Sequence, residues 1–309
     1  MNRFLHILIA LIAALSVAAA DNTLVILHTN DTHSQIDPDF DGKGGVLRRK
    51  VIIDSIRAAC PNVILVDAGD AVQGTPYFNI YRGEVEVAML DSLRYDFITL
   101  GNHEFDNGLP SMFPFYSRMR PHLLSTNYDL SRTCLKNIAL PCEVRSVGNR
   151  NIGFIAANVN PVGLVNAENC EGLGYNNPLI VLDSVAGILK HSYGVDYVVM
   201  LSHLGYSYND GRISDIDVAK ASSNIDLIIG GHTHTLINPA KGNPVVKNRD
   251  GRDVLICQAG SLGKYLGKVE VNLDDLTASS SLIPVTKQYD SRVSPALTAA
   301  LAPYKHKVD

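Results

Sequence analysis

The sequence predicts an α/β protein whose strands and helices alternate along the chain. Short apolar runs bounded by Gly, Asn and Asp are separated by segments whose apolar residues recur at helical spacing, as in βαβ units. Two adjacent apolar runs, at 143–147 and 151–157, predict a hairpin and so indicate a second sheet layer. Because no internal repeat or low-complexity linker is present, one domain with a mixed sheet covered by helices is the simplest organisation.

The predicted elements follow one another in a regular order. The first helix, at about 46–60, rests on Val46, Ile53 and Ile56, which recur at helical spacing. The further helices are predicted at about 79–93, 179–191 and 214–223, and the last residues have helical character. Besides the hairpin, strands are predicted within 23–29, 62–70, 95–106, 121–128, 195–205, 225–235, 253–260 and 265–274.

Composition places the chain among globular proteins. Of its 309 residues, 46% are hydrophobic and 19% are charged, and this balance is ordinary for a soluble domain. The formal net charge is −4, so the sequence predicts no basic surface for a nucleic-acid polymer.

The first twenty residues have the pattern of a secretory signal peptide. Arg3 precedes an apolar run from about Phe4 to Val17, and three alanines at 18–20 form an A-x-A-like cleavage site. A membrane anchor is the alternative, but the run is shorter than the roughly 20 residues that span a bilayer. Cleavage near Ala20 would remove one positive charge and change the net charge from −4 to −5. We therefore expect a secreted or periplasmic protein with no membrane span after signal cleavage.

The cysteines leave two alternatives open. Cys134 and Cys142 bracket a short loop and could form one disulfide in an oxidising compartment. Alternatively, all five cysteines are small buried thiols. No C-x-x-C motif is present, so the sequence predicts no thiolate metal site.

Five of the predicted strands end in similar polar sequences: HTNDTHS, VDAGD, LGNHEFD, LSHLG and GGHTHT. In open α/β sheets the carboxyl ends of the strands converge on one crevice, where ligands bind. A solvated loop would explain one such end, but five together indicate a shared site. The side chains that this brings together are Asp31, His33, Asp70, Asn102, His103, Asp106, His203, His232 and His234.

The chemistry of this set predicts a metal centre. Carboxylates, an amide and imidazoles without thiolates suit Zn²⁺, Mn²⁺, Fe or Co. Asp31 and His33 are two residues apart, so an extended backbone would point both side chains the same way, and His232 and His234 share this spacing. The ligands exceed what one tetrahedral ion needs. A site with two divalent ions and a shared carboxylate would use them all.

The order of these motifs resembles that of the calcineurin-like metallophosphoesterases. The motifs are D-x-H, G-D, G-N-H-E, a histidine after a strand, and G-H-T-H, and the stretches VILHTNDTHS and GNHEFDNG narrow the resemblance to the 5′-nucleotidase branch. The resemblance covers about residues 23–275. It implies a four-layer αββα sandwich of two mixed sheets, with a dinuclear metal site at the carboxyl ends of the strands.

The resemblance also implies a role for each site residue. One ion would be held by Asp31, His33, Asp70 and His234. A second ion would share Asp70 and be completed by Asn102, His203 and His232. His103 and Asp106 match the family's catalytic dyad, in which the histidine stabilises charge on the phosphoryl group or protonates the leaving oxygen.

The implied activity is hydrolysis of phosphomonoesters of nucleotides or related phosphoesters by in-line attack of a metal-bridging hydroxide. A thiosulfohydrolase-like or cyclic-nucleotide phosphodiesterase activity is an alternative within the same branch. A further alternative is a metal-binding half or binding subunit that requires a partner chain.

The resemblance divides the chain into a signal peptide at 1–20, a metallophosphoesterase domain at 21–285 and a tail at 286–309. The tail resembles a helix that links to a second, substrate-binding domain, which the sequence lacks. A partner chain could supply that domain, the first domain could act alone as an unselective phosphatase, or the sequence is truncated. Any stacking on a base within this chain would need Tyr or Phe, and Tyr77, Tyr206 and Tyr208 lie near the motifs.

Overall fold

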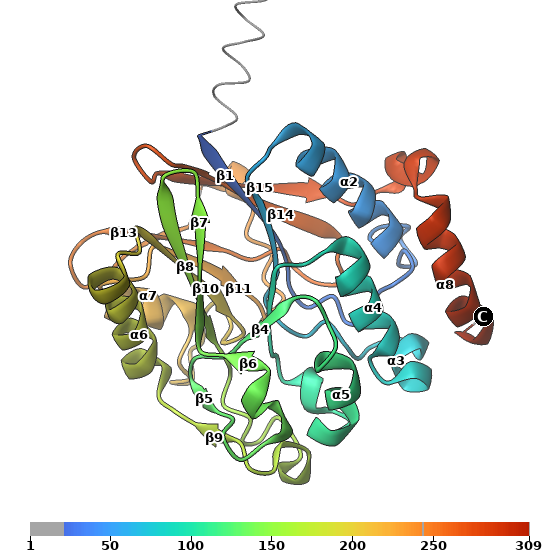
Figure 1. Ribbon diagram of the computed structural model, residues 1–309, viewed down its shortest axis with the longest axis horizontal. Helices are drawn as coiled ribbons and strands as arrows, with labels where there is room; N and C mark the ends of the chain where they lie inside the picture. Colours follow the sequence, from blue (N-terminus) through green and yellow to red (C-terminus); the bar gives the residue numbers. More distant parts are fainter. Residues whose placement is uncertain (1–21, 243, 309) are drawn as a thin grey trace, which may run out of the picture.

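The computed structural model describes residues 22–242 and 244–308 (Figure 1). The predicted signal peptide at 1–20 lies outside the described residues. Among the described residues, no helix combines the length and the apolar character needed to cross a membrane.

The first sheet has seven strands in the order β15-β14-β1-β2-β3-β4-β6. Strands β1, β2, β3, β4 and β6 run parallel, and β14 is antiparallel to both of its neighbours. The strands are β1 (Thr23–Thr29), β2 (Val63–Asp67), β3 (Phe97–Thr99), β4 (His122–Leu124), β6 (Ala139–Leu140), β14 (Tyr265–Asn272) and β15 (Ala278–Pro284).

The second sheet has six strands in the order β12-β13-β11-β10-β8-β7. Its four central strands are parallel, and β12 and β7 pair antiparallel at the two edges. The strands are β7 (Cys142–Val147), β8 (Arg150–Ala157), β10 (Tyr197–Ser202), β11 (Leu227–Gly230), β12 (Val245–Lys247) and β13 (Asp253–Cys257). The predicted hairpin is confirmed as β7–β8. A small separate sheet pairs β5 (Tyr128–Asp129) with β9 (Gly174–Tyr175).

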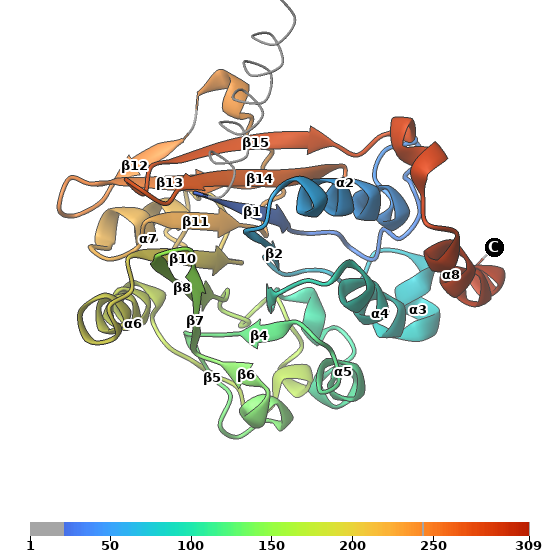
Figure 2. The same ribbon diagram turned by 45° about the horizontal axis from the view of Figure 1, so that its top comes forward.

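Helices cover the outer faces of both sheets (Figures 1 and 2). On the side of the first sheet lie α2 (Val46–Ala59), α3 (Pro76–Tyr81), α4 (Glu84–Leu93), α5 (Leu109–Tyr116) and α8 (Pro295–Val308). On the side of the second sheet lie α6 (Pro178–Tyr193) and α7 (Asp215–Ala221). Short 3-10 turns occur at η1 (His103–Phe105), η2 (Cys134–Asn137), η3 (Ala167–Cys170), η4 (Pro239–Lys241) and η5 (Lys287–Arg292).

The core consists of three hydrophobic layers, which is the packing of an αββα sandwich. Along β1, Val25 and Leu27 join the cluster under α2, α4 and α5, while Leu24 and Ile26 join the cluster between the sheets. Side chains alternate between the faces of a strand, so one apolar run serves both layers. A third cluster packs the other face of the second sheet against α6 and α7. The predicted four-layer fold is confirmed.

The structure differs from the local predictions in three ways. The helix expected at 79–93 is two helices, because the backbone turns left-handed at Arg82 (φ 55°) and Gly83 (φ 103°), which ends α3 and starts α4. Strand β15 and helix α5 were not predicted. All five cysteines are free thiols, but only Cys257 is buried, so the alternative of five buried thiols is wrong as well. Cys134 lies in η2 with its Sγ 3.6 Å from the Leu109 carbonyl, whereas Cys142 packs with the α6–α7 cluster, so the two do not pair.

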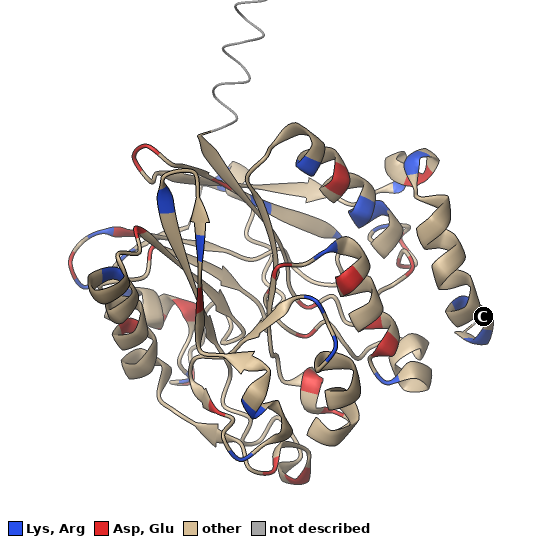
Figure 3. Ribbon diagram, viewed as in Figure 1, with Lys and Arg blue, Asp and Glu red and all other residues tan. Residues whose placement is uncertain are grey.

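Charged residues of both signs occur along the elements of the described chain. Lys and Arg are scattered among Asp and Glu along the elements in the view of Figure 3. Several are paired, as in the contact of Arg48 with Asp290, which ties α2 to η5.

Candidate metal centre

The polar ends of five parallel strands meet where the two sheets adjoin. Asp31, Asp70 and Asn102 follow β1, β2 and β3 of the first sheet, while His203 and His232 follow β10 and β11 of the second. Hydrogen bonds join the two sheets at this edge. The backbone N–H of His232 donates to both carboxylate oxygens of Asp31 at 3.0 Å, and His203 Nδ1 lies 2.7 Å from the Ala68 carbonyl oxygen.

The loops that carry the predicted ligands have an unusual backbone. The φ angle is 48° at Asp31, 47° at His33, 54° at Asp70, 71° at His232 and 52° at His234. This left-handed conformation costs energy in non-glycine residues, and such strain is concentrated at functional sites. The expectation that each i, i+2 pair lies in extended backbone is therefore wrong. Both pairs lie beyond the ends of their strands, so the local turn decides where each side chain points.

A first group of candidate ligands consists of Asp31, His33 and His234. The ligand atoms of these three residues lie within 4.8 Å of one another. The Nε2 atoms of His33 and His234 are 2.9 Å apart, and His234 Nε2 is 3.5 Å from Asp31 Oδ1. Two imidazole nitrogens and a carboxylate oxygen thus surround one small volume.

A second group consists of Asp70, His203 and His232, whose ligand atoms also lie within 4.8 Å of one another. His203 Nε2 is 3.0 Å from Asp70 Oδ2 and 3.9 Å from Asp31 Oδ1. A third, overlapping group of His33, Asp70 and His103 connects the first two. His232 and His234 therefore belong to different groups, although only one residue separates them.

Asn102 lies beside the second group. It is buried, and its Oδ1 atom has no hydrogen-bond partner among the described residues. Its neighbour His103 donates its backbone N–H to Asp70 Oδ1 at 2.8 Å. A buried amide oxygen normally finds a partner, so an unpartnered one in the residue next to this Asp70 contact fits a cation ligand.

The charges at the site also fit a cation. Burial lowers the pKa of His203, but Asp70 and Asp31 outweigh this effect and raise it to about 10. Burial would raise the pKa of Asp70, yet His203 holds it well below its ordinary value. The buried carboxylates thus require a positive charge nearby. Burial lowers the pKa of His232 to about 4, so its imidazole is neutral near pH 7, the form that binds metal.

His103 and Asp106 form a pair at the edge of the site. His103 Nδ1 lies 2.8 Å from Asp106 Oδ2, and this hydrogen bond raises the pKa of His103 against the effect of burial. The centroids of the His103 and His33 rings lie 5.3 Å apart, and the two rings meet edge to face. With Nδ1 engaged by Asp106, Nε2 remains for a substrate oxygen.

Glu104 is a supporting residue to which the motif pattern assigned no role. Its buried carboxylate accepts backbone N–H groups from Asp70 at 3.0 Å, Ala71 at 2.9 Å and Gly101 at 2.5 Å. Burial and the nearby Asp70 raise the pKa of Glu104 to about 7. The side chain therefore clamps the Asp70 loop to the Asn102 loop. The signal in the sequence that could have indicated this role is the position of Glu104 inside the G-N-H-E motif.

Two amides support the other loops. Asn30 donates to Asp31 Oδ2 and to the Gly260 carbonyl, both at 2.6 Å, and so orients the Asp31 carboxylate. Gln258 donates to the Gly231 carbonyl at 2.7 Å, and its Oε1 accepts the backbone N–H of Thr235. Gln258 thus spans the turn that carries both histidines of the G-H-T-H motif.

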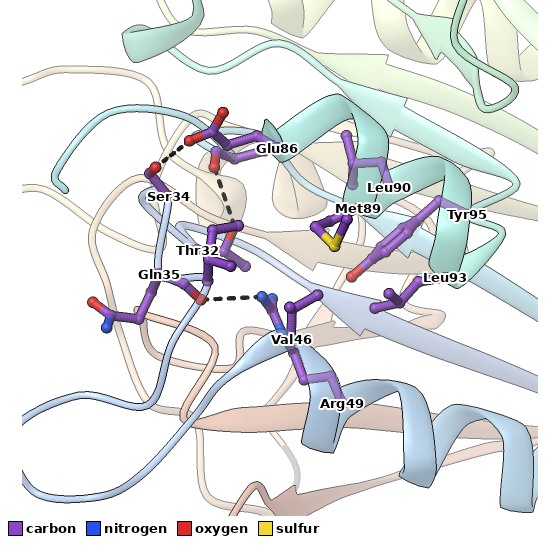
Figure 4. A pocket seen from close by; sticks show the side chains of 12 residues that line it. Thr32, Ser34, Gln35, Val46, Arg49, Glu86, Met89, Leu90, Leu93 and Tyr95 are labelled. Carbon is purple, nitrogen blue, oxygen red and sulfur yellow. Dashed lines mark hydrogen bonds between the residues drawn. The ribbon is translucent and has the colours of Figure 1, made fainter. Parts of the chain in front are cut away.

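The turn after His33 borders a small pocket between α2 and α4 (Figure 4). Ser34 (φ 57°) donates its hydroxyl to Glu86 Oε1 and accepts a hydrogen bond from the Thr75 hydroxyl at 2.9 Å. Burial raises the pKa of Glu86. These contacts hold the strained turn at Ser34 in place. His28, in contrast, is buried within β1 against Gly267, outside these groups.

Comparison with known proteins agrees with this geometry. A profile of the calcineurin-like phosphoesterases matches residues 24–236. The chain is 35% identical over 286 residues to the snake venom 5′-nucleotidase of Crotalus adamanteus, an alignment that covers 85% of this chain and 47% of that protein. It is 30% identical to the 5′-nucleotidase of Homo sapiens, over 98% of this chain and 56% of that protein.

The fold comparison gives the same result. The crystal structure of a 5′-nucleotidase precursor from Thermus thermophilus matches with a TM-score of 0.81 and 33% identity, over 92% of this chain and 59% of that one. The chain thus spans about half the length of the curated relatives it matches. By sequence profile, by relatives and by fold, the chain belongs to the calcineurin-like phosphoesterase family.

Proposed function

We propose that the chain is a phosphohydrolase that depends on two divalent metal ions and acts on nucleotides or related phosphomonoesters. The observation that carries the proposal is the division of the candidate ligands into two adjacent groups, one with His234 and one with His232. The names of the relatives support a nucleotide as substrate.

In this proposal Asp31, His33 and His234 hold one ion, and His203, His232 and Asn102 hold the other. Asp70 would serve both ions, because it belongs to the second group and also, in the overlapping third group, lies near His33 of the first group. The ions, which would be Mn, Zn, Fe or Co, would supply charge neutralisation at the phosphoryl oxygens and an activated water near neutral pH.

The residues of the chain have distinct tasks around the reacting phosphate. His103, oriented by Asp106 at 2.8 Å, is placed to donate a proton or hydrogen bond to the phosphoryl or leaving oxygen. Glu104 and Asn30 keep the carboxylates in position through hydrogen bonds to the loops and to Asp31. Preorganised ligands of this kind need no rearrangement when charge develops.

We propose further that residues 1–20 direct secretion, that 21–285 form the catalytic domain, and that 286–309 link it to a substrate-binding partner or domain. The coverage of about half of each relative's length supports this last element. The ion pair of Lys305 with Asp37 at 2.8 Å holds α8, the C-terminal helix, against the catalytic domain.

The test is phosphate release by the purified chain after removal of metal and reloading with Mn²⁺. Adenosine 5′-monophosphate, UDP-glucose, a cyclic nucleotide and an aryl phosphate are compared side by side. We expect hydrolysis of the monophosphate that chelation abolishes and Mn²⁺ restores. If the chain binds two ions and hydrolyses none of these esters, the activity proposal for the isolated chain is wrong, and the requirement for a partner chain is favoured.

A further inference from the structure

We propose that a pocket beside the metal centre binds the uncharged leaving group of the substrate, the nucleoside of a nucleoside 5′-monophosphate. The inference rests on the proposed function, because the phosphate held at the metal centre fixes where the nucleoside lies. The pocket has a volume of about 370 Å³, within the range of roughly 300–1,000 Å³ for small-molecule sites. Its walls come from strand β9 and from the loops that follow β8 and β10, and they include Asn160, Val162, Tyr175, Leu204, Tyr208 and Arg212.

One wall of the pocket is continuous with the metal-binding loops. Leu204 follows His203 directly and lines the pocket. The Tyr208 hydroxyl donates to the Leu204 carbonyl at 2.7 Å. Gly205 (φ 100°) packs closely against Tyr208 and Thr233. A Cβ atom at this position would clash with the Tyr208 hydroxyl oxygen and would lie 2.7 Å from Thr233 Cγ2. Because Thr233 lies between the two histidines of the G-H-T-H motif, this wall contacts the metal-binding turn.

A second part of the lining is continuous with the loop that supports the His103–Asp106 pair. Val159, at the start of this loop, lines the pocket and accepts a hydrogen bond from the Tyr128 hydroxyl at 2.5 Å. Further along the same loop, Asn169 Nδ2 donates to the Asp106 carbonyl at 2.8 Å. The loop therefore borders the pocket at one end and supports the His103–Asp106 pair at the other. A leaving group that receives a proton from His103 has this pocket next to it.

The lining fits an uncharged aromatic group. Tyr175 and Tyr208 supply two aromatic rings, and the Arg212 guanidinium lies 3.9 Å from the centre of the Tyr208 ring. Arg212 Nη2 lies 2.9 Å from Asp210 Oδ2, and this ion pair compensates the charge of the guanidinium. The pocket therefore does not supply an uncompensated positive charge for a further phosphate. Asn160 offers polar atoms that can recognise a base or a sugar.

One apolar residue of the pocket lining is exposed to solvent. Val162 is 84% exposed although it belongs to the lining. Covering this side chain with a planar base would bury apolar area and stabilise the complex. The exposed residue also gives a substitution that does not disturb the core.

The test measures how much the base contributes to catalysis. We compare kcat/KM for adenosine 5′-monophosphate with kcat/KM for ribose 5-phosphate, because the second substrate keeps the phosphorylated sugar and lacks the base. The pocket variants are Tyr208→Ala and Val162→Glu. Tyr208→Phe keeps the ring and loses only the hydroxyl. Ile188→Glu on α6 is the matched control for Val162→Glu, because Ile188 is also exposed (50%) and is not part of the lining.

We expect the ratio of the two kcat/KM values to fall about 5- to 150-fold in Tyr208→Ala, the range for loss of one base–aromatic stack. Val162→Glu should lower the ratio as well, while Ile188→Glu keeps the wild-type ratio and Tyr208→Phe, which retains the ring, lowers the ratio less than Tyr208→Ala. An unchanged ratio in both pocket variants, with ribose 5-phosphate still hydrolysed, would overturn the pocket assignment and leave the proposed function intact.

Direct binding separates the two proposals if no ester is hydrolysed. Equilibrium dialysis with radiolabelled adenosine needs neither metal nor turnover. Binding by the wild type that Val162→Glu weakens and Ile188→Glu does not would support the pocket even if the phosphatase proposal failed. Absence of adenosine binding by the wild type, or equal loss in both glutamate variants, would refute it.

Discussion

The Nε2 atoms of His33 and His234 lie 2.9 Å apart, although 201 residues separate these histidines in the sequence. The first follows a strand of one sheet and the second follows a strand of the other. Asp31 Oδ1 is 3.5 Å from the same nitrogen of His234. The edge where the two sheets meet therefore forms the candidate site, and neither sheet alone supplies all of its ligands.

Replacing His103 with alanine should reduce turnover without removing metal. Asp106 engages Nδ1 of this histidine, which leaves Nε2 to act on a substrate oxygen in the proposed function. We expect kcat to fall about 10²- to 10⁴-fold, the range for positioned acid–base groups. Steady-state kinetics and metal analysis of the same preparation check this.

Two outcomes would contradict the role of His103. Normal turnover in the alanine variant would show that the histidine takes no part in the chemistry. Loss of one metal equivalent would make it a ligand, an interpretation that its presence in the group with His33 and Asp70 allows. Asp106→Asn should keep both ions and lower kcat by a smaller factor.

Substituting Glu104 with glutamine should loosen the metal-binding loops. A carboxylate accepts the three N–H groups of Asp70, Ala71 and Gly101, whereas an amide turns one acceptor into a donor and leaves at least one buried N–H unpaired. We expect a loss of about 1–3 kcal/mol in the free energy of unfolding, the cost of an unsatisfied buried group. Denaturant unfolding of the metal-free protein measures it, and an unchanged midpoint would contradict the clamp.

Asp215 should make stability depend on pH. Its carboxyl is fully buried, one oxygen accepts the Ser202 hydroxyl at 2.5 Å, and Oδ2 has no hydrogen-bond partner among the residues that the structure describes. Burial raises the pKa of Asp215 to about 7 from an ordinary value of 3.8. The folded state therefore binds the proton more tightly than the unfolded state, and ionisation destabilises the fold as pH rises from about 4 to 7.

Asp215→Asn removes this ionisation and keeps the shape of the side chain. The variant's melting temperature relative to wild type should rise steadily from about pH 4 to pH 7, the interval between the unfolded and folded pKa values, measured on metal-free protein at each pH. A difference between variant and wild type that stays constant over this range would show that Asp215 does not titrate there.

Much of the fold was predictable because its signals are local. The apolar runs give the strands, and β1 and β10 alternate between two buried faces without needing polar residues. The division of the long helix at Arg82 was not predictable from apolar spacing, since it depends on a left-handed turn. Helix α5 contains Pro110 and Pro114, which conceal its helical character in the sequence.

The sequence predicted which residues are candidates for the site, but it predicted less well how these residues are arranged. Polar residues after buried strands identified the candidate ligands, because the ends of parallel strands converge. The expectation from i, i+2 spacing was wrong, since Asp31 and His33 adopt positive φ rather than extended backbone. Glu104 and Gln258 support the site through contacts with residues distant in the sequence, and the spacing of motifs carries no information on such contacts.

The central claim is that His232 and His234 serve different ions, with Asp70 between them. The most direct measurement is a crystal structure of the Mn²⁺-loaded chain with anomalous diffraction at the manganese edge. We predict two anomalous peaks, one contacted by Asp31, His33 and His234 and the other by Asn102, His203 and His232. A single peak, or one peak contacted by both His232 and His234, would contradict the claim.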